Sequence, residues 1–455
     1  MLGLPTGISR FIGYYIGSGE NKKVKSVEGW GLLFGSLSGI LFGVLLFIVA
    51  PIIAPLFSEK EVFVDYIKIA AITLPFYAVI NSLISISGGH QRVREKILFF
   101  DVGRGLLFLA LAIITCIFSF PFIGIIWSMF AAISVISISF FIYYLIRKEN
   151  KLKEFGSFDF SVSMGKRILL FSLPLLLVNI LAMVMQWTDT IMIGIFDTEE
   201  AVGFYNIARP LSKFISMALS VSLFIYTPLV AGLYAQKKFR ENDIIFSTIT
   251  RWICILTLPL TMVLLFYGDD IISTFFGEEY LEAGLPLRIL AVVFFLHNLM
   301  GPNGATLTAY AKTRYLMYTA SISACLNIIL NFFLIQSYGI AGAAVATGIS
   351  IISINLLRVF YLRNISGIHP FKSNIIKPVL LTSVVGSVLI LILDLLSVPG
   401  ILLAIISFFL TLLLFLITML WTKSISKQDL KMIIIIEKRV GIDLTILKRI
   451  LKRFI

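Results

Sequence analysis

The sequence predicts an all-α fold, a polytopic membrane helical bundle with twelve visible spans, and two features of its composition lead to this class. Apolar residues make up 58% of the 455 residues and charged residues only 14%, whereas soluble domains carry about 25% charged residues. The mean hydropathy is +0.98. A chain with so little polar surface cannot cover itself in water, so we expect its surroundings to be lipid.

The individual spans are visible as long apolar runs. A bilayer core requires about 20 apolar residues in helical form. Prolines inside such runs are compatible with this assignment, because neighbouring helices satisfy the backbone groups that a proline frees. The twelve runs cover residues 30–57, 66–87, 98–119, 121–146, 168–196, 204–233, 244–267, 285–310, 315–336, 340–361, 375–393 and 399–421.

The loops between these runs alternate in charge. One set of loops, taken with the C-terminal tail, holds 29 of the 38 Lys and Arg residues, and the other set holds one basic residue, Lys60, and 12 of the 25 acids. Basic loops stay on the cytoplasmic side of a membrane. We therefore expect a multi-pass protein of the cell membrane with both visible termini in the cytoplasm. Orientation also explains the net charge of +13, so we expect no nucleic-acid partner.

The chain also repeats itself after about 220 residues, a period that indicates a duplicated bundle. Lys68 aligns with Arg288, and Arg94 aligns with Arg314. In transporters built this way, the substrate site lies between the repeats. The repeat predicts two pseudo-symmetric lobes and four regions: an N-lobe (1–150), a C-lobe of six helices (163–362), two further C-terminal spans (370–422) and an amphipathic tail on the inner leaflet (423–455).

Two expectations concern the ends of the chain. The register places the start of the first repeat before Met1, so the N-lobe lacks its first helix and most of its second. We expect a truncated or mis-started reading frame whose intact form would have 14 spans. For the tail, the alternative to an interfacial helix is a solvated segment.

Two stretches carry a resemblance to a known family: LGLPTGISRFIGYYIGSGENKKV, and WTDTIMIGIFDTEEAVGFYNIARPLSKF with its D-x-x-x-I-G and V-G-x-Y-x-x-A pattern. The chain resembles the polysaccharide-transporter and O-antigen-flippase branch of the multidrug/oligosaccharidyl-lipid/polysaccharide exporter superfamily. The resemblance implies two six-helix lobes that rock about a central cavity. It also implies a glycan linked to a polyprenyl phosphate or pyrophosphate as the cargo. The pattern residues are Asp189, Ile193, Gly194, Val202, Gly203, Tyr205 and Ala208.

Fixed cations inside the spans are the candidate substrate site. A charge at the centre of a bilayer costs at least about 2.5–3.5 kcal/mol, so each needs a reason. The planar guanidinium of Arg suits an anionic phosphate head. Lys68 and Arg288 occupy the same register in the two repeats, and the alternative is that both reach outward to acids such as Asp65 and Glu282. The predicted cavity cations are Arg10, Lys68, Arg209, Lys213 and Arg288.

Asp189 is an acid placed well inside a span. Two interpretations stay open for it. It either binds a proton or a sodium ion that couples transport to a gradient, or it forms a salt bridge with Arg209 or Lys213 on the next helix. His297 lies in mid-span, where a lone His is more often a hydrogen-bonded packing residue than a proton relay.

The sequence contains no nucleophile elbow, phosphate loop, metal cluster or paired catalytic carboxylates, so we expect a transporter without cofactor or metal rather than an enzyme. The favoured function is a flippase for a lipid-linked oligosaccharide or polysaccharide precursor that works by alternating access. A cation-coupled multidrug exporter is the first alternative, and the surplus of basic residues argues against it. A membrane glycosyltransferase or ligase is the second, although the longest outer loop has little room for a catalytic domain.

Overall fold

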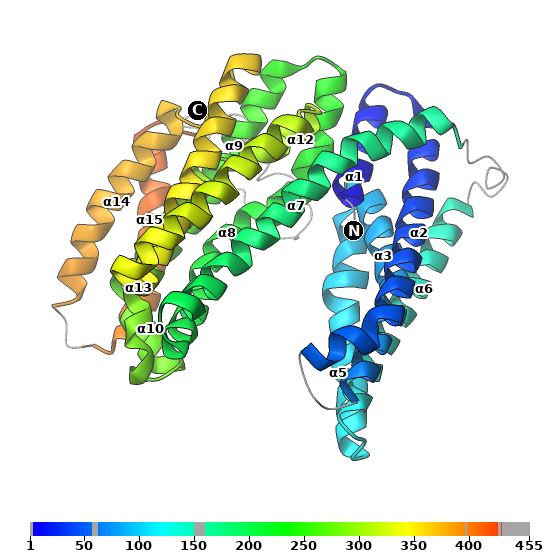
Figure 1. Cartoon of the computed structure of the whole chain (residues 1–455). Helices are drawn as coiled ribbons and strands as arrows, with labels where there is room; N and C mark the ends of the chain where they lie inside the picture. The colour runs from blue at the N-terminus through cyan, green and yellow to red at the C-terminus, as the bar shows by residue number, and fades with distance from the viewer. Residues whose placement is uncertain (1–2, 57–61, 150–159, 396–397, 426–428, 430–455) are drawn as a thin grey trace. The chain divides into compact units, whose positions relative to one another are not determined.

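The computed structural model describes residues 3–56, 62–149, 160–395, 398–425 and 429, and these residues form helices joined by turns, with no β-strand. Eleven of the helical segments are long and apolar enough to cross a membrane. The chain divides into two compact units, and Figure 1 shows the helices of each. This architecture confirms the predicted class, an all-α membrane bundle.

The N-terminal unit comprises Met1–Asn179, Phe224–Lys237 and Thr308–Arg314. In it α2 packs against α3, and α3 packs against α6. Its helices are α1 (Leu4–Gly17), α2 (Asn21–Ile53), η1 (Ala54–Leu56), α3 (Val62–Gly89), α4 (Val93–Glu95), η2 (Lys96–Gly103), α5 (Arg104–Ile117), α6 (Ile123–Glu149) and the first part of α7 (Val162–Phe196).

The C-terminal unit comprises Ile180–Leu223, Lys238–Leu307 and Tyr315–Ile455. Its core lies around α9, which packs against α11, α14 and α15. Besides the rest of α7, it contains most of α8 (Glu199–Ala235), α9 (Phe239–Phe266), α10 (Gly268–Phe275), η4 (Glu278–Ala283), α11 (Gly284–Leu299), α12 (Asn303–Ala309), α13 (Thr313–Ser366), α14 (Ser373–Leu393) and α15 (Gly400–Trp421).

The helix α13 explains why eleven segments account for twelve predicted spans. It has 54 residues, and at a rise of about 1.5 Å per residue it is far too long for a single crossing of a bilayer core. Gly339 interrupts it with a left-handed backbone (φ 55°, ψ −137°). The side chain of Ser323 before this break donates a hydrogen bond to the carbonyl of Ser350 after it. The two halves of α13 therefore pack together as two antiparallel spans, as the runs 315–336 and 340–361 predict.

The backbone carries the predicted repeat as well. Gln91 and Ala311, which are 220 residues apart, both have φ 59° at the end of a helix. Ser119 and Gly339 show the same separation, with φ 52° and 55°. Left-handed backbone is unfavourable for residues with a side chain, so its recurrence at matched positions reflects a shared turn geometry.

The two repeats differ in how far their spans are buried. In α2 the most apolar stretch is 22% buried, whereas in α9, which occupies the corresponding register, it is 67% buried. The helices α14 and α15 have no counterpart in the first repeat, and both lie against α9. The face of α2 consequently keeps large apolar side chains such as Leu37, Leu41 and Ile48 exposed, which is the surface expected of a helix facing lipid.

One span of the N-terminal unit departs from α-helical geometry. The segment Val93–Ile117 begins as α-helix, changes to the π-helix η2 over eight residues, and continues as α5. π-Helical turns are rare and mark an inserted residue within an α-helix.

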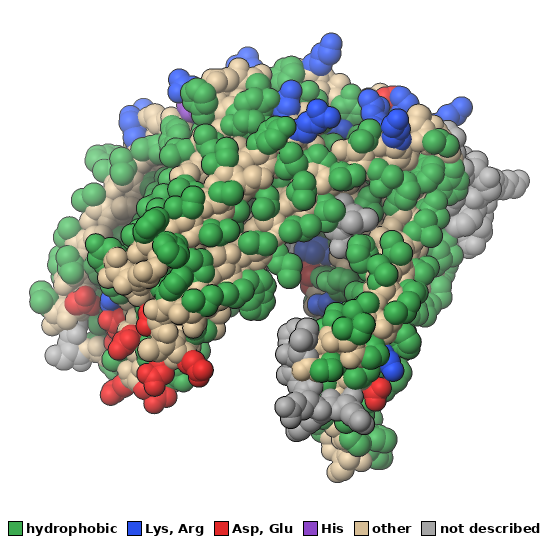
Figure 2. Space-filling view, in the orientation of Figure 1, with side chains coloured by type: hydrophobic (Ala, Val, Ile, Leu, Met, Phe, Trp, Pro, Cys, Tyr) green, Lys and Arg blue, Asp and Glu red, His purple; other side chains and the backbone are tan. Residues whose placement is uncertain are grey.

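Charge separates along the C-terminal unit. On the face that Figure 2 shows, most visible acidic side chains of this unit gather at one end, near α10, and most Lys and Arg lie at the other end. The acids of α10 and η4 include Asp270, Glu278 and Glu279. The predicted region boundaries remain predictions, and most of the predicted tail, 426–428 and 430–455, lies outside the described residues.

Candidate functional site

Asp189 of α7 is the centre of a buried polar cluster in the C-terminal unit. Its side chain is fully buried. The hydroxyls of Tyr205 and Thr347 donate to Oδ2 at 2.9 and 2.7 Å. The amides of Asn331 and Asn327 donate to Oδ1 at 2.8 and 3.4 Å. Both carboxylate oxygens are thus hydrogen-bonded, which is the condition under which a carboxylate tolerates burial.

Three spanning segments bring these partners to Asp189. Tyr205 lies on α8, one hairpin along the chain. Asn327 and Asn331 are four residues apart on the first half of α13 and therefore share one helix face. The break at Gly339 folds the second half of α13 back, so that Thr347 reaches both Asp189 and Asn327. The site depends on this turn.

Arg209 completes the cluster from α8. One of its terminal nitrogens lies 3.8 Å from Oδ2 of Asp189, a salt bridge longer than a hydrogen bond, and the side chain is 17% exposed. The other terminal nitrogen donates to the carbonyl of Gln186. The sequence left open whether Asp189 pairs with Arg209, and the structure brings these two predicted residues together. Lys213 lies one helical turn further along α8, where it is exposed.

Two acceptors beside Asp189 remain unsatisfied. The side-chain oxygens of Asn327 and Asn331 are buried without a hydrogen-bond partner among the described residues. Buried polar atoms are usually hydrogen-bonded, so such a pair needs an explanation. Both amides turn their nitrogens toward Asp189, so their oxygens would join the carboxylate as ligands of a small hard cation only after the amides rotate. Within the described ranges, no group of three His, Cys, Asp or Glu residues comes together.

Arg288 and Lys68, the predicted symmetric pair, belong to different units. Arg288 donates to the carboxylate of Asp269 at 2.6 Å and to the carbonyl of Leu265 at 3.1 Å. An acid does pair with it, although this acid is neither of the two that the alternative interpretation named. Lys68 lies 5.7 Å from the ring centre of Phe47. Their joint role in one cavity stays a prediction.

Arg10 of α1 is the most enclosed of the predicted cations, with 5% of its surface exposed. Its Nε donates to the carbonyl of Ala309 at 3.1 Å. The rings of Phe11, Tyr14 and Phe171 surround the guanidinium, with centres 4.9, 4.8 and 5.4 Å away. Aromatic faces attract a cation and compensate part of its lost hydration.

Comparison with known proteins places this arrangement in a family. The profile of a family described as "Polysaccharide biosynthesis protein" matches residues 32–285, more than half of the chain. The chain belongs to this polysaccharide biosynthesis family. Membership confirms the resemblance that the sequence motifs indicated.

Individual members and folds agree with this placement. The chain is 31% identical to a probable low-salt glycan biosynthesis flippase of Haloferax volcanii, over 39% of this chain and 38% of that protein. It is 29% identical to a teichuronic acid biosynthesis protein of Bacillus subtilis, over 44% of this chain and 41% of that protein. The matches span less than half the length of these relatives. A crystal structure of MATE in the bent conformation covers 80% of this chain and 83% of its own, with a TM-score of 0.72 and 14% identity, which shows a shared fold.

Some residues of the sequence motif lie in the polar cluster around Asp189. Two of its residues, Asp189 and Tyr205, are the hydrogen-bonded pair at the centre of the cluster. Ala208, a third residue of the motif, is fully buried on α8. The motif therefore supplies Asp189 and one of its four neutral donors, and the other three come from α13.

Sequence reasoning missed most of the partners of Asp189. Tyr205 was identified only as a motif residue, and Asn327, Asn331 and Thr347 were not identified at all. The i, i+4 spacing of two Asn residues inside an apolar run was the available signal, because amides in a span need a polar partner.

A second buried acid, Glu28, was also missed. It lies in the N-terminal unit, where His90 contacts one carboxylate oxygen at 2.7 Å and the hydroxyl of Tyr144 donates to the other at 2.9 Å. Glu95 is equally buried and accepts hydrogen bonds from Ser87 and Arg147. The sequence placed His90 and Glu95 in a basic loop, and only packing shows their connection to α2 and α6.

Two further buried groups, His297 and Arg251, have partners within the C-terminal unit. His297 contacts the amide of Asn355 at 2.8 Å, which in turn hydrogen-bonds Asn303, and this agrees with a packing role. Arg251 is 1% exposed and forms a 2.5 Å ion pair with Asp429, whose other oxygen accepts from the indole of Trp252. This ion pair attaches the chain beyond α15 to α9.

Proposed function

We propose that this protein is a flippase that moves a lipid-linked oligosaccharide or polysaccharide precursor across the cell membrane by alternating access. Family membership supports a role in polysaccharide biosynthesis. The relative from Haloferax volcanii bears the name of a glycan biosynthesis flippase. The fold shared with MATE supports a transporter rather than an enzyme.

The substrate chemistry explains the protein's polar groups. A glycan cannot cross hydrocarbon unaided, because its hydroxyls would lose their water partners. The phosphate or pyrophosphate that links it to a polyprenyl chain is anionic and suits a guanidinium. The observation that carries the proposal is Arg209, a partly exposed guanidinium inside a spanning helix, whose nearest acid is already hydrogen-bonded by four neutral groups. Arg209 is 17% exposed and its 3.8 Å contact with Asp189 is longer than a hydrogen bond, so its guanidinium is also open to a phosphate. Arg10, Lys68, Lys213 and Arg288 are the further candidates.

The test is flipping in reconstituted vesicles that contain a fluorescent polyprenyl-pyrophosphate-linked sugar. We expect Arg209→Ala to slow flipping about ten- to hundredfold, since hydrogen bonds to charged groups contribute about 1.5–3 kcal/mol. Arg209→Lys should retain part of the rate. Arg240→Ala, which alters an exposed Arg at the basic end of α9, is the control. Equal rates for Arg209→Ala and Arg240→Ala would contradict the role of Arg209.

Asp189 is the proposed site of a coupling ion, a proton or Na⁺. The buried side-chain oxygens of Asn327 and Asn331 have no hydrogen-bond partner among the described residues, and rotation of the two amides would turn these oxygens toward the carboxylate as further ligands for a cation. A proton or Na⁺ bound at Asp189 would weaken the contact between Asp189 and Arg209. Occupancy of the ion site would then control how strongly Arg209 attracts a phosphate. We expect Asp189→Asn to abolish the dependence of flipping on a Na⁺ or proton gradient. Replacing Na⁺ by K⁺ at fixed pH distinguishes the two ions, and a gradient dependence that survives in Asp189→Asn would refute the assignment.

The proposed orientation places the basic loops in the cytoplasm. Cysteine labelling tests it after Cys116, Cys254 and Cys325 are changed to Ser. A membrane-impermeant maleimide added to intact cells should label Glu279→Cys and leave Arg240→Cys unlabelled. The reverse pattern would invert the topology.

A multidrug exporter is the alternative that the MATE fold keeps open. Organic cations require acidic or aromatic cavity walls, whereas four of the five polar groups around Asp189 are neutral and the fifth is cationic. Expression in a drug-sensitive host separates the two functions. Resistance to organic cations without glycan flipping would favour the exporter.

A further inference from the structure

The turn after α3 is attached to its neighbours by titratable side chains that the proposed flippase function does not use. His90 lies in this turn, and its Nε2 lies 2.7 Å from a carboxylate oxygen of Glu28 on α2. Tyr144 of α6 donates to the other oxygen at 2.9 Å. The side chain of Glu28 is 8% exposed and that of His90 is 20% exposed. These three residues, the Glu28 cluster, thus connect a turn to two helices through one buried carboxylate.

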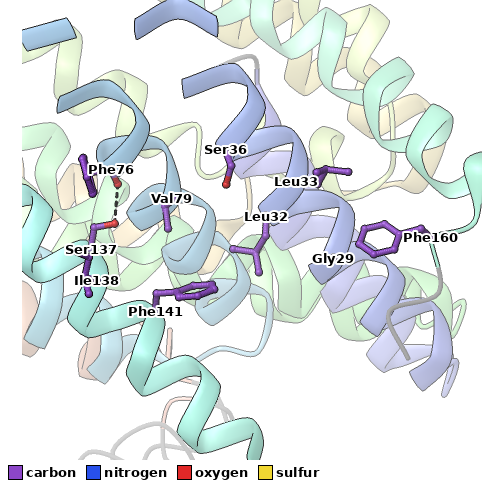
Figure 3. A pocket seen from close by; sticks show the side chains of 10 residues that line it. All are labelled: Gly29, Leu32, Leu33, Ser36, Phe76, Val79, Ser137, Ile138, Phe141 and Phe160. Atoms are coloured by element: carbon purple, nitrogen blue, oxygen red, sulfur yellow. Dashed lines mark hydrogen bonds between the residues drawn. The ribbon is translucent and has the colours of Figure 1, made fainter. Parts of the chain in front are cut away.

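The Glu28 cluster bridges two helices that are separated by a hollow. Both α2 and α6 pack on α3. Figure 3 shows the hollow between them, with Leu32 of α2 and Phe141 of α6 on its walls and the hydroxyl of Ser137 bonded to α3. Glu28 lies four residues before Leu32, and Tyr144 lies three residues after Phe141, so both lie at the basic end of the hollow. Their hydrogen bond joins α2 to α6 directly at that end.

Glu95 attaches the same turn a second time. Its carboxylate accepts hydrogen bonds from Ser87 on α3 and from Arg147 on α6. Glu95 ends α4, and the π-helix η2 follows directly and leads into α5. No residue of α5 is buried. The polar contacts of the turn therefore hold the start of a span that has little packing of its own.

His90 is the member of the cluster whose charge changes near neutral pH. Imidazole groups titrate between about pH 5 and 8, whereas ordinary Lys, Arg and Tyr groups stay protonated there and ordinary Asp and Glu groups stay ionised. The chain has three His residues, and the other two, His297 and His369, lie in the C-terminal unit. An imidazolium forms an ion pair with Glu28, and such a charged contact is about twice as strong as a neutral hydrogen bond.

The charged groups around the cluster have partners of their own. Arg92 lies 4.0 Å from the carboxylate of Glu95. The helix α1, which packs on α2 and α3, carries one charged residue, Arg10, and its guanidinium donates to the carbonyl of Ala309. Among the described residues, the charged side chains closest to the cluster along its own elements are Lys25, Arg92, Arg94, Glu95 and Arg147. All of these are of types that keep their charge between about pH 5 and 8.

The matched turn of the second repeat contains no imidazole. Gln91 and Ala311 correspond in the two turns, are both exposed and share a φ of 59°. The residue that corresponds to His90 is Tyr310, whose ring stacks on that of Tyr234 with centres 4.4 Å apart. A contact between stacked phenol rings does not change over this pH range, so the second turn is an internal reference for the first.

We propose that the Glu28 cluster is a pH-dependent attachment, which holds the turn after α3 against α2 and α6 while His90 is protonated and loosens as the pH rises. The ion pair exists only while the imidazole is charged, so its contribution is present at about pH 5.5 and is lost toward about pH 8. Tyr144 keeps its hydrogen bond in both states, so α2 and α6 stay joined while the turn and the start of η2 gain mobility. A pH change on the side of the basic loops would therefore act on one repeat and leave the other unchanged. This property goes beyond the proposed flippase function and does not depend on it.

Spin labels compare the two matched turns in the same protein. After Cys116, Cys254 and Cys325 are changed to Ser, a nitroxide is attached at Gln91→Cys or at Ala311→Cys, and its mobility in nanodiscs is measured by electron paramagnetic resonance at about pH 5.5 and 8. We expect the mobile fraction of the label at position 91 to rise about fivefold with pH, because a charged contact is replaced by a neutral one. The label at position 311 should not change. An unchanged label at position 91, or equal changes at both positions, would overturn the proposal.

Substitutions at the cluster assign the effect to the imidazole. His90→Gln keeps an N–H donor for Glu28 but has no charge to lose, so it should abolish the pH dependence at position 91. His369→Gln, which alters a His of the C-terminal unit, is the matched control and should leave the pH dependence intact. Glu28→Gln should also abolish it and replaces His90→Gln if that variant does not fold. A pH dependence that survives in His90→Gln or Glu28→Gln, or that disappears in His369→Gln, would overturn the proposal.

Discussion

The two repeats share a backbone plan and differ in their buried chemistry. Matched turns carry left-handed residues at Gln91 and Ala311 in equivalent places. Within the spans the similarity ends. The first half of α13 supplies Asn327 and Asn331 to Asp189, whereas the corresponding helix of the first repeat, α5, contains no amide side chain. The two repeats therefore share the geometry of their turns, whereas the polar side chains buried within their spans differ.

The buried acids illustrate the same contrast. In the C-terminal unit Asp189 is held by neutral donors and one Arg deep in a span. In the N-terminal unit Glu28 is held by His90 and Tyr144 near the basic end of its helix. At a separation of 220 residues, Glu28 and His90 correspond to Thr248 and Tyr310. Neither network therefore has a copy in the other repeat.

The largest effect is expected at Asp189. Asp189→Leu would leave Arg209 and four donors without their acceptor, and removal of one partner from a buried ion pair costs about 3–5 kcal/mol. Thermal unfolding in detergent measures the loss. Glu200→Gln, an exposed acid on α8, is the control and should stay within about 0.5 kcal/mol of the parent. Equal unfolding temperatures for both variants would show that the cluster does not stabilise the C-terminal unit.

A comparable effect is expected at the other buried ion pair of this unit. Asp429→Ala would remove the carboxylate that pairs with the buried Arg251 and accepts from Trp252, at a cost of about 3–5 kcal/mol. The double variant Asp429→Ala with Arg251→Met should recover much of the loss, because apolar replacements of buried pairs are often neutral. A double variant less stable than Asp429→Ala would argue against the pairing.

A smaller effect is expected in the N-terminal unit. Glu28→Leu removes the acceptor of His90 and Tyr144, and each unsatisfied buried group costs about 1–3 kcal/mol. The same unfolding assay, with Asp65→Leu at the exposed start of α3 as control, measures the difference. A loss larger than that of Asp189→Leu would reverse the comparison between the repeats.

The smallest effect concerns the shared turns. Gly339→Ala places a side chain on a left-handed backbone and should cost about 1–2 kcal/mol. Ser119→Gly relieves the same strain in the first repeat and should be neutral or slightly stabilising. If Gly339→Ala lowers the free energy of unfolding and Ser119→Gly does not, the result would support the equivalence of the two turns. A decrease in both variants would contradict it.

Most of the fold could be predicted from the sequence because lipid imposes a simple rule of length and hydropathy on every span. The twelve runs correspond to the observed helices, and the repeat correctly indicated equivalent turns. Helix ends were less well predicted. For example, α2 begins at Asn21, nine residues before the predicted span, because a helix continues into the polar interface once started.

The site was only partly predictable. Asp189 and Arg209 were identified because charges inside a span are costly and therefore conspicuous. Their neutral partners were not, because an Asn or Thr in a span carries no comparable signal. Which helix face meets which depends on packing between α7, α8 and α13. Apolar periodicity does not report this when all sides of a helix are hydrophobic.

The π-helix η2 has a consequence for any alignment of the two repeats. A π-helical turn uses about one residue more than an α-helical turn, so the residues after it are rotated by about 100° around the helix axis relative to an unbroken α-helix of the same length. Each position of α5 thus faces a different neighbour from the one its residue number alone would suggest. Deleting a single residue between Lys96 and Gly103 would restore α-helical geometry to this segment and rotate α5 about its axis. In a homologue shortened in this way, the side chains of α5 should therefore face different neighbours.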